Sequence, residues 1–205
     1  MTVPSSRADV AGPAGRIETA IDTPVGDVRG VAVLCHPHPL HGGTMDNKVV
    51  QTLARAFVQL GWRAVRFNFR GVGASQGQWD QGCGEVDDAL AVVAAQRDPP
   101  LPLALGGFSF GGYVAAQAAA RLAAAGTPAR RVVLIGPATS AFAVPPVPAD
   151  SLVVHGEADD VVPLQATLDW ARPQGLPVVV LPGVGHFFHG QLTRLRELVL
   201  RGLSR

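Results

Sequence analysis

The segment LALGGFSFGG, residues 103–112, decides the fold of this chain. An apolar, strand-like run enters a G-x-S-x-G turn, and an alanine-rich, helix-forming segment leaves it. Gly107 and Gly111 flank Ser109 at positions where a Cβ would collide with the neighbouring strand or helix. A turn of this kind is typical of a nucleophile elbow, because it exposes the serine hydroxyl to a base and to backbone N–H groups.

Two later segments carry an acid and then a histidine. Residues 151–163, SLVVHGEADDVVP, indicate a short buried strand followed by a loop that contains Asp159 and Asp160. Residues 176–182 form another strand-like run, and His186 follows it closely. The order serine, aspartate, histidine is the one associated with the α/β-hydrolase fold, and it differs from the orders of the chymotrypsin and subtilisin triads.

Five motifs together resemble the loops of a known family. GFSFGG, HGEADDVVP and GVGHFF are similar to the three triad-bearing loops of serine α/β-hydrolases. CHPHPLHGGTMDNK and FNFRGVGASQG resemble the loops after the third and fourth strands of the small, lid-less branch related to dienelactone hydrolases. The similarity extends from roughly residue 16 to residue 200. Dienelactone hydrolases have a cysteine at the elbow, whereas this chain has Ser109, and this departure weakens any inference of their lactone substrate.

The resemblance implies a catalytic triad of Ser109, Asp159 and His186. Ser109 would be the nucleophile, His186 the base, and Asp159 the acid that holds the imidazole in the productive tautomer. Asp160 is the alternative acid, because the register of a motif can slip by one residue. His189, one turn further on, is the alternative base. This chemistry requires no cofactor and no metal.

Two backbone N–H groups are expected to form an oxyanion hole. One is the N–H of Phe110, which directly follows the nucleophile at the start of a helix. The second should come from residues 36–39, His-Pro-His-Pro, where the prolines have no N–H to donate. His38 is therefore the best donor by elimination and by alignment with the family's motif, with Leu40 in reserve.

The loop of residues 136–151 joins two predicted strands at the position where family members commonly insert a cap. It is short and rich in proline, so too little chain remains for a folded cap domain. By resemblance the site should be shallow and open, with Phe142 and Val144 as rim residues. The alternative, of equal weight, is that the loop only bridges two strands. Leu40, Phe142 and Phe187 are the candidate substrate-binding residues.

Three of the other histidines form an H-x-H-x-x-H pattern. His36, His38 and His41 have a spacing that suggests zinc, and a metal-dependent hydrolase is one alternative function. Zinc ligands must converge on one point with supporting groups around them. Prolines break this stretch into a loop, so we expect no metal site. His155 is expected to support the loop of Asp159 by hydrogen bonding.

Strands and helices alternate along the chain, which predicts an α/β class with a mostly parallel central sheet, helices on both faces and no cap domain. Residues 1–15 are polar and contain proline and glycine, so they are expected to be flexible, and residues 16–205 are expected to form a single α/β-hydrolase domain. The expected strands are 16–21, 29–34, 63–69, 103–108, 131–135, 151–155 and 176–182, and the expected helices are 46–60, 85–97, 111–125, 164–171 and 188–200.

The composition limits the classes of partner. Among 205 residues the formal net charge is +1, and acidic and basic residues are dispersed, so we expect neither nucleic acid nor an anionic membrane as partner. No apolar leader or membrane-length run occurs, which favours a cytoplasmic location. Cys35 and Cys83 are expected to be reduced thiols. The oligomeric state remains open.

These observations predict a serine hydrolase that cleaves a small-molecule ester, as a carboxylesterase does, through an acyl-enzyme intermediate. The same triad could instead serve a thioesterase or a peptidase or amidase. The other alternative is a non-catalytic binding protein that has the α/β-hydrolase fold.

Overall fold

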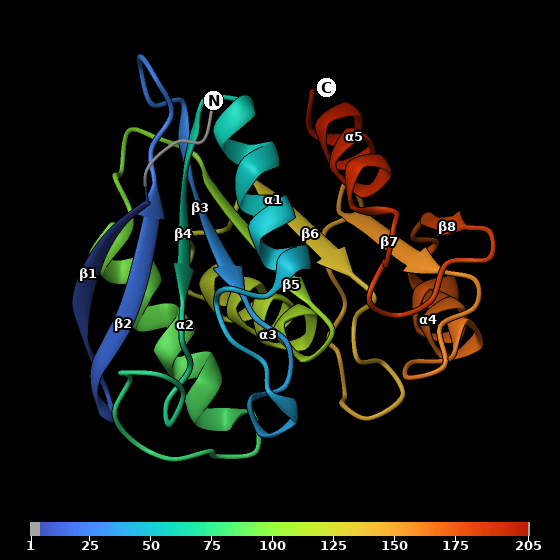
Figure 1. The fold of residues 1–205 in the computed structure, drawn as a ribbon, viewed down its shortest axis with the longest axis horizontal. Coiled ribbons are helices and arrows are strands. Elements are labelled where there is room, and N and C mark those ends of the chain that lie inside the picture. The colour runs from blue at the N-terminus through green and yellow to red at the C-terminus, as the bar shows by residue number, and fades with distance from the viewer. Residues whose placement is uncertain (1–4, 205) are drawn as a thin grey trace.

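The core of the molecule is one mostly parallel sheet (Figure 1). The computed structural model describes residues 5–204. Its strands are β1 (Ser5–Gly12), β2 (Gly15–Asp22), β3 (Gly30–Cys35), β4 (Trp62–Phe67), β5 (Leu103–Phe108), β6 (Arg131–Ile135), β7 (Leu152–Gly156) and β8 (Val178–Leu181). Within the described range they pair in the order β1-β2-β4-β3-β5-β6-β7-β8. Strands β3 to β8 are parallel, whereas β1 and β2 form an antiparallel hairpin beside β4.

Helices cover both faces of the sheet, as predicted (Figure 1). They are α1 (Lys48–Gln59), α2 (Cys83–Gln96), α3 (Phe110–Ala124), α4 (Leu164–Ala171) and α5 (Leu192–Leu203). Val31 and Val33 of β3 lie in the core formed with α2 and α3, whereas Ala32 and Leu34 lie in the core formed with α1 and α5. This alternation follows from the two-residue period of a strand. A central parallel strand buried on both faces must therefore be apolar throughout, as β3 is.

The carboxyl ends of the parallel strands meet at one edge of the sheet. Cys35 at the end of β3 is paired with Gly107 of β5, and Phe108 is paired with Ile135 at the end of β6. The loops that follow β3, β5, β7 and β8 therefore leave the sheet on the same side. In open α/β sheets this edge is where ligands bind.

The loop after β6 forms no cap. Residues 136–151 contain neither helix nor strand, and the loop packs back on the molecule instead. Trp170 of α4 donates its indole N–H to the carbonyl of Val144 at 2.9 Å. Val144 is only 8% exposed, so it is a packing residue and the expectation that it lies at the rim of the site is wrong.

The N-terminus differs from the expectation of a flexible segment over residues 1–15. Residues 5–12 form the edge strand β1, which pairs with β2 from Ser5↔Asp22 to Gly12↔Gly15. Its composition is polar because most of its side chains face solvent, and Val10 is the exception that joins the core. An edge strand that is almost wholly exposed carries no apolar pattern by which its sequence would predict it. Residues 1–4 lie outside the described residues.

The last helix begins later than its apolar stripe suggests. Phe188 precedes α5, has a φ of 52° and is fully buried in the core with α1 and α5. Its N–H donates to the carbonyl of Gly185 at 3.1 Å, so residues 185–188 form a turn. This turn has a functional consequence, because His186 lies within it.

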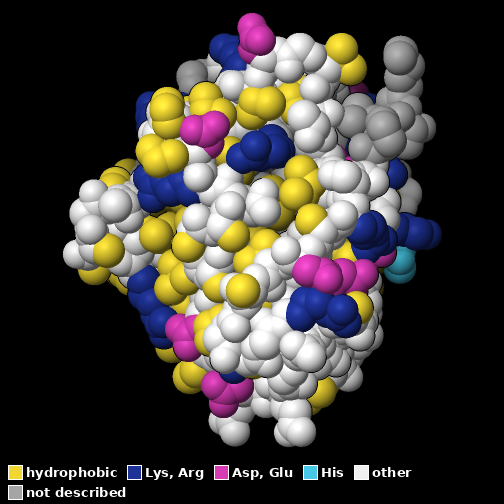
Figure 2. Space-filling view, turned by 90° about the vertical axis from the view of Figure 1, so that its left-hand side faces the viewer, with side chains coloured by type: hydrophobic (Ala, Val, Ile, Leu, Met, Phe, Trp, Pro, Cys, Tyr) yellow, Lys and Arg dark blue, Asp and Glu magenta, His cyan; other side chains and the backbone are white. Residues whose placement is uncertain are grey.

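Charges of both signs are interspersed on the face of the molecule that contains the sheet edge at β1 (Figure 2). None of the described helices combines the length and the hydropathy needed to span a lipid bilayer. Cys35 and Cys83 are both free, as expected. Cys35 is fully buried, and burial raises the pKa of its thiol far above the ordinary value.

A buried histidine links the loops after β3 and β4. His36 Nδ1 donates to the carbonyl of Pro37 at 2.6 Å, and its Nε2 accepts the N–H of Phe69 at 3.1 Å. Both ring nitrogens are thus used by the neutral form. Burial lowers the pKa of His36 from 6.5 to about 4, while the bond to Pro37 opposes that shift.

We predict that His36 makes the protein less stable in mild acid. Between the unfolded pKa of 6.5 and the folded pKa of about 4, the unfolded chain binds a proton that the folded chain does not. The free energy of unfolding should therefore fall by about 1.4 kcal/mol per pH unit on acidification through this window because of His36. Urea unfolding of the wild type and His36→Gln at several pH values between 7 and 4 measures this, and equal pH slopes for the two proteins would contradict it.

Candidate active site

Ser109 occupies a sharp turn between β5 and α3. Its φ is 56° and its ψ is −119°, a conformation that residues other than glycine rarely adopt. The N–H of Ser109 donates to the carbonyl of Ile135 at 2.9 Å, and its carbonyl accepts the N–H of Gly112 at 2.9 Å. The surrounding backbone thus holds the serine in a strained conformation, as an elbow requires.

Two glycines make this turn sterically possible. A Cβ added to Gly107 would lie 2.0 Å from the carbonyl oxygen of Gly111. A Cβ added to Gly111 would lie 2.2 Å from the carbonyl oxygen of Cys35. The start of α3 therefore packs directly on the end of β3 and on β5, backbone against backbone.

The structure brings the three predicted triad residues together. His186 Nε2 is 3.0 Å from Ser109 Oγ, and His186 Nδ1 is 2.7 Å from Asp159 Oδ2. Because a carboxylate can only accept, the proton of a neutral His186 is on Nδ1, and Nε2 accepts the hydroxyl proton of Ser109. All three side chains are buried or nearly so, with exposed fractions of 8%, 7% and 3% for Ser109, Asp159 and His186.

Asp159 is held in its ionised form. Its Oδ1 accepts the N–H groups of Val161 at 3.0 Å and Val162 at 2.7 Å, which leaves Oδ2 for His186. Burial alone would raise the pKa of Asp159, but the hydrogen bonds from His186, Val162 and Val161 together lower it below its ordinary value. A charged carboxylate here would stabilise the imidazolium that forms when His186 accepts a proton.

The two alternative triad residues lie elsewhere. Asp160 is exposed, and its carboxylate has no hydrogen bond to any described residue. His189 is exposed as well, and its ring stacks on Phe187 with a centroid separation of 5.7 Å. Neither side chain joins the hydrogen-bonded chain of Ser109 and His186.

The two expected oxyanion donors are available at the same edge of the sheet. Phe110 is the first residue of α3, and its N–H has no acceptor within residues 5–204. The same is true of the N–H of His38, which precedes the short 3-10 helix of Pro39–His41. The N–H of Leu40, by contrast, donates to His38 Nδ1 at 3.2 Å. Leu40 is thus the weaker of the two candidates in this loop.

A family model described as serine aminopeptidase, S33, matches residues 27–150, which include the elbow. The chain belongs to this family of α/β serine hydrolases. A solved α/β serine hydrolase without a lid from Xanthomonas campestris is 40% identical, with a TM-score of 0.90, and the match covers 100% of this chain and 96% of the other.

Two further proteins are similar to this chain. An α/β serine hydrolase homologue from Coxiella burnetii is 39% identical, with a TM-score of 0.85 and 99% of each chain covered. An uncharacterized protein of Rickettsia prowazekii is 44% identical over 109 residues, which are 52% of this chain and 46% of that protein. The chain thus matches about half the length of this curated relative.

Apolar side chains lie in the loops that carry the site of this α/β serine hydrolase. Leu40, Val161 and Phe187 are 65%, 53% and 49% exposed. Phe142 is half-buried, with its ring 5.1 Å from that of Phe110. Of the three predicted substrate-binding residues, Leu40 and Phe187 are thus exposed, and Phe142 packs beside the elbow.

Sequence reasoning missed an aromatic residue near the elbow of the hydrolase. Trp79 lies in the loop after β4, with its ring centroid 4.5 Å from that of His38 and 5.1 Å from that of Phe110. The signal that would have found it is a tryptophan two residues after the glycine-rich loop motif, in a loop at the carboxyl edge of the sheet. His41 stacks on His38 at 4.5 Å, so these two histidines have ring partners.

His155 supports the acid loop, as expected. Its Nε2 is 2.9 Å from the carbonyl of Val162, to which it donates, and 3.4 Å from Asp159 Oδ2. Its buried Nδ1 has no partner in the described part of the chain. Burial lowers the pKa of His155, so the neutral form with its proton on Nε2 fits this site.

We predict that His155 acts on the reaction through the position of Asp159. His155→Leu removes the donor to Val162 and should slow the reaction of Ser109 with a fluorophosphonate by about tenfold or more, because misplaced catalytic groups lose reactivity steeply. His155→Gln keeps an N–H donor at a similar reach and should lose less. Thermal unfolding of both variants serves as the control for folding. Labelling at the wild-type rate in His155→Leu would refute this role.

Proposed function

We propose that this serine hydrolase cleaves a small carboxylic ester through an acyl-enzyme on Ser109. The observation that carries the proposal is the single imidazole of His186, which lies 3.0 Å from Ser109 Oγ and 2.7 Å from Asp159 Oδ2. A serine hydroxyl is a weak nucleophile at neutral pH, and this arrangement is the one that activates it.

In the first half of the reaction Ser109 Oγ bonds to the ester carbonyl carbon, and His186 Nε2 takes the hydroxyl proton. The ionised Asp159 stabilises the resulting imidazolium through its bond to Nδ1. The tetrahedral intermediate then collapses. The bond from the carbonyl carbon to the alcohol oxygen breaks, and His186 returns its proton to the departing alcohol.

In the second half water replaces the alcohol. His186 takes a proton from the water while the water oxygen bonds to the acyl carbon, and the bond to Ser109 Oγ breaks as the serine regains a proton. The products are one carboxylic acid and one alcohol, and the enzyme returns to its starting state.

The N–H groups of Phe110 and His38 would stabilise the negative oxygen of both tetrahedral intermediates. Both lack acceptors among the described residues, so each can donate without breaking an existing bond. Phe110 also begins α3, whose dipole favours negative charge at this end. Preorganised donors of this kind contribute a large share of catalysis in acyl transfer.

The surroundings favour a short substrate. Leu40, Phe142 and Phe187 offer apolar contacts at the rim, and residues 136–151 form no cap that would cover a long acyl chain. A peptide substrate is the second candidate, because the matching family model is described as serine aminopeptidase. A panel of esters, thioesters and aminoacyl amides compared by kcat/KM distinguishes these substrate classes.

The first test of the nucleophile is covalent labelling. A fluorophosphonate should label the protein once, and peptide mapping should place the adduct on Ser109 because that hydroxyl alone has a base within hydrogen-bond distance at the elbow. Ser109→Ala should remain unlabelled. An adduct on a cysteine with Ser109 intact, or no adduct at all, would argue for a different mechanism or a non-catalytic protein.

Mutation of the two histidines in this loop identifies the catalytic base. His186→Ala should lose about as much turnover as Ser109→Ala, because members of a triad act as a unit. His189→Ala is the matched control three residues away in the same loop, and its loss of turnover should be mild. A severe loss in His189→Ala with a mild one in His186→Ala would reverse the assignment.

The open site predicts a simple dependence on substrate length. Initial rates on aryl acetate, butyrate and long-chain esters should decrease with acyl length, because an uncovered site buries few methylenes and each is worth only about 0.8 kcal/mol. Rates should also rise smoothly through the solubility limit, since no lid has to open. A sharp increase above that limit would show that one of the loops serves as a lid.

A further inference from the structure

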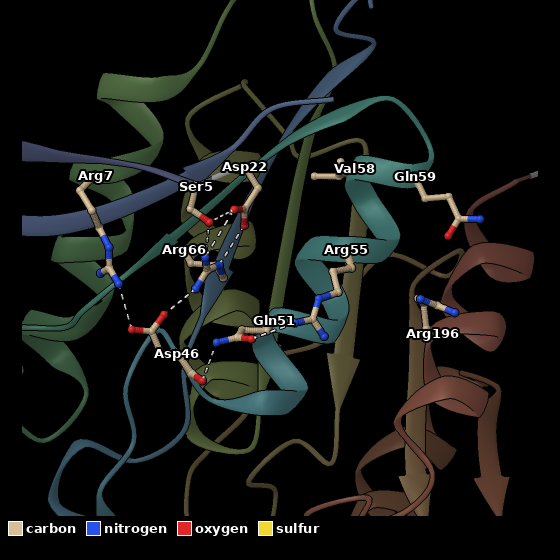
Figure 3. Close-up of a pocket in the computed structure, with 10 residues that line it drawn as sticks. All are labelled: Ser5, Arg7, Asp22, Asp46, Gln51, Arg55, Val58, Gln59, Arg66 and Arg196. Carbon is tan, nitrogen blue, oxygen red and sulfur yellow. Dashed lines mark hydrogen bonds and ion pairs between the residues drawn. The ribbon is translucent and has the colours of Figure 1, made fainter. Parts of the chain in front are cut away.

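A cavity lies away from the triad. It has a volume of about 680 Å³, and side chains of β1, β2, β4, α1 and α5 line it (Figure 3). None of the triad residues contributes to its walls. Its volume falls in the range of small-molecule sites in proteins.

Arginines outnumber carboxylates in this cavity. The charged side chains that line it are Arg7, Arg55, Arg66, Arg196, Asp22 and Asp46. Basic side chains thus outnumber acidic ones in the walls. The position of that excess decides what the cavity can bind.

The two carboxylates are already used by the arginines on the sheet side. Arg66 donates to Asp22 at 3.0 Å and to Asp46 at 2.8 Å, and its guanidinium is almost fully buried. Arg7 donates to the other oxygen of Asp46 at 3.1 Å. The sheet side of the cavity is therefore close to neutral.

The excess charge lies on the helix side. Arg55 of α1 donates to Gln51 Oε1 at 3.1 Å, and Gln51 in turn donates to the carbonyl of Asp46 at 3.0 Å. Gln51 thus fixes the Arg55 guanidinium without neutralising it. Arg196 of α5 has a buried Nε that lacks a partner within residues 5–204. In Figure 3 Arg55 lies on α1 with its guanidinium bonded to Gln51, Arg196 lies on α5, and no dashed line joins either to a carboxylate.

We propose that this cavity binds the phosphate group of a small phosphorylated molecule between Arg55 and Arg196. Two guanidiniums without counter-ions repel each other, and a dianion between them removes that repulsion. The planar fork of each guanidinium matches two oxygens of a phosphate. The carboxylate of Asp46 is an acceptor for hydroxyl groups on the rest of the ligand.

The test uses isothermal titration of the full chain with inorganic phosphate and with ribose 5-phosphate, after a fluorophosphonate or Ser109→Ala has removed the catalytic serine as a competing site. Ribose and an ionic-strength-matched chloride solution are the ligand controls. We expect saturable binding of both phosphates, tighter for ribose 5-phosphate, and none of ribose or chloride.

The variants locate the binding site. Arg55→Gln and Arg196→Gln should each weaken binding of ribose 5-phosphate by about tenfold or more, because each removes charge-assisted hydrogen bonds to the phosphate. Arg194→Gln is the matched control, since Arg194 is an exposed arginine on the same helix that does not line the cavity. It should bind as the wild type does.

The proposal would be overturned by the absence of saturable binding, by an equal loss in Arg194→Gln and in the two cavity variants, or by unchanged affinity in both Arg55→Gln and Arg196→Gln. Should Arg55→Gln unfold, Arg55→Lys keeps the charge and the stem, and it should retain weakened binding. If the single variants Arg55→Lys and Arg196→Gln both bind ribose 5-phosphate with wild-type affinity, the proposal is overturned.

Discussion

The close backbone contact at the elbow is the constraint on which the rest of this structure depends. A Cβ at Gly111 would clash with the carbonyl of Cys35, and a Cβ at Gly107 would clash with the carbonyl of Gly111. Neither position therefore has room for a side chain. This contact places the start of α3 directly against the end of β3. It therefore sets the nucleophile, the helix dipole and the loop that begins at His36 in one fixed arrangement.

The fold and the triad could be predicted because they are encoded locally. The parallel sheet follows from apolar runs such as β3 that alternate with amphipathic helices. Each triad residue follows a strand and lies within a recognisable loop motif: Ser109, Asp159 and His186. The topology of a parallel sheet then brings these loops to one edge. The choice between Asp159 and Asp160 required the structure, since adjacent residues on a turn point in different directions.

Other features could not be predicted because they depend on contacts between distant segments. The polar strand β1 is stabilised by its pairing with β2, so its own composition indicates little. Trp79 joins the site only through the packing of the β4 loop against His38. The arginine-lined cavity combines residues from both ends of the chain. The net charge of +1 for the whole sequence gives no indication of this local excess of arginine.

The separation of the triad along the chain affects how this protein acquires its reactive serine. Ser109 and His186 are 77 residues apart, and the loop that carries His186 follows β8, three strands beyond β5 in the sheet. Parallel strands are joined by crossovers and form contacts of high sequence separation, which makes folding slow. A partly folded chain can already contain the elbow, yet its serine has no base. Serine reactivity during refolding therefore reports the docking of the last strand, and it should appear later than helical circular dichroism does.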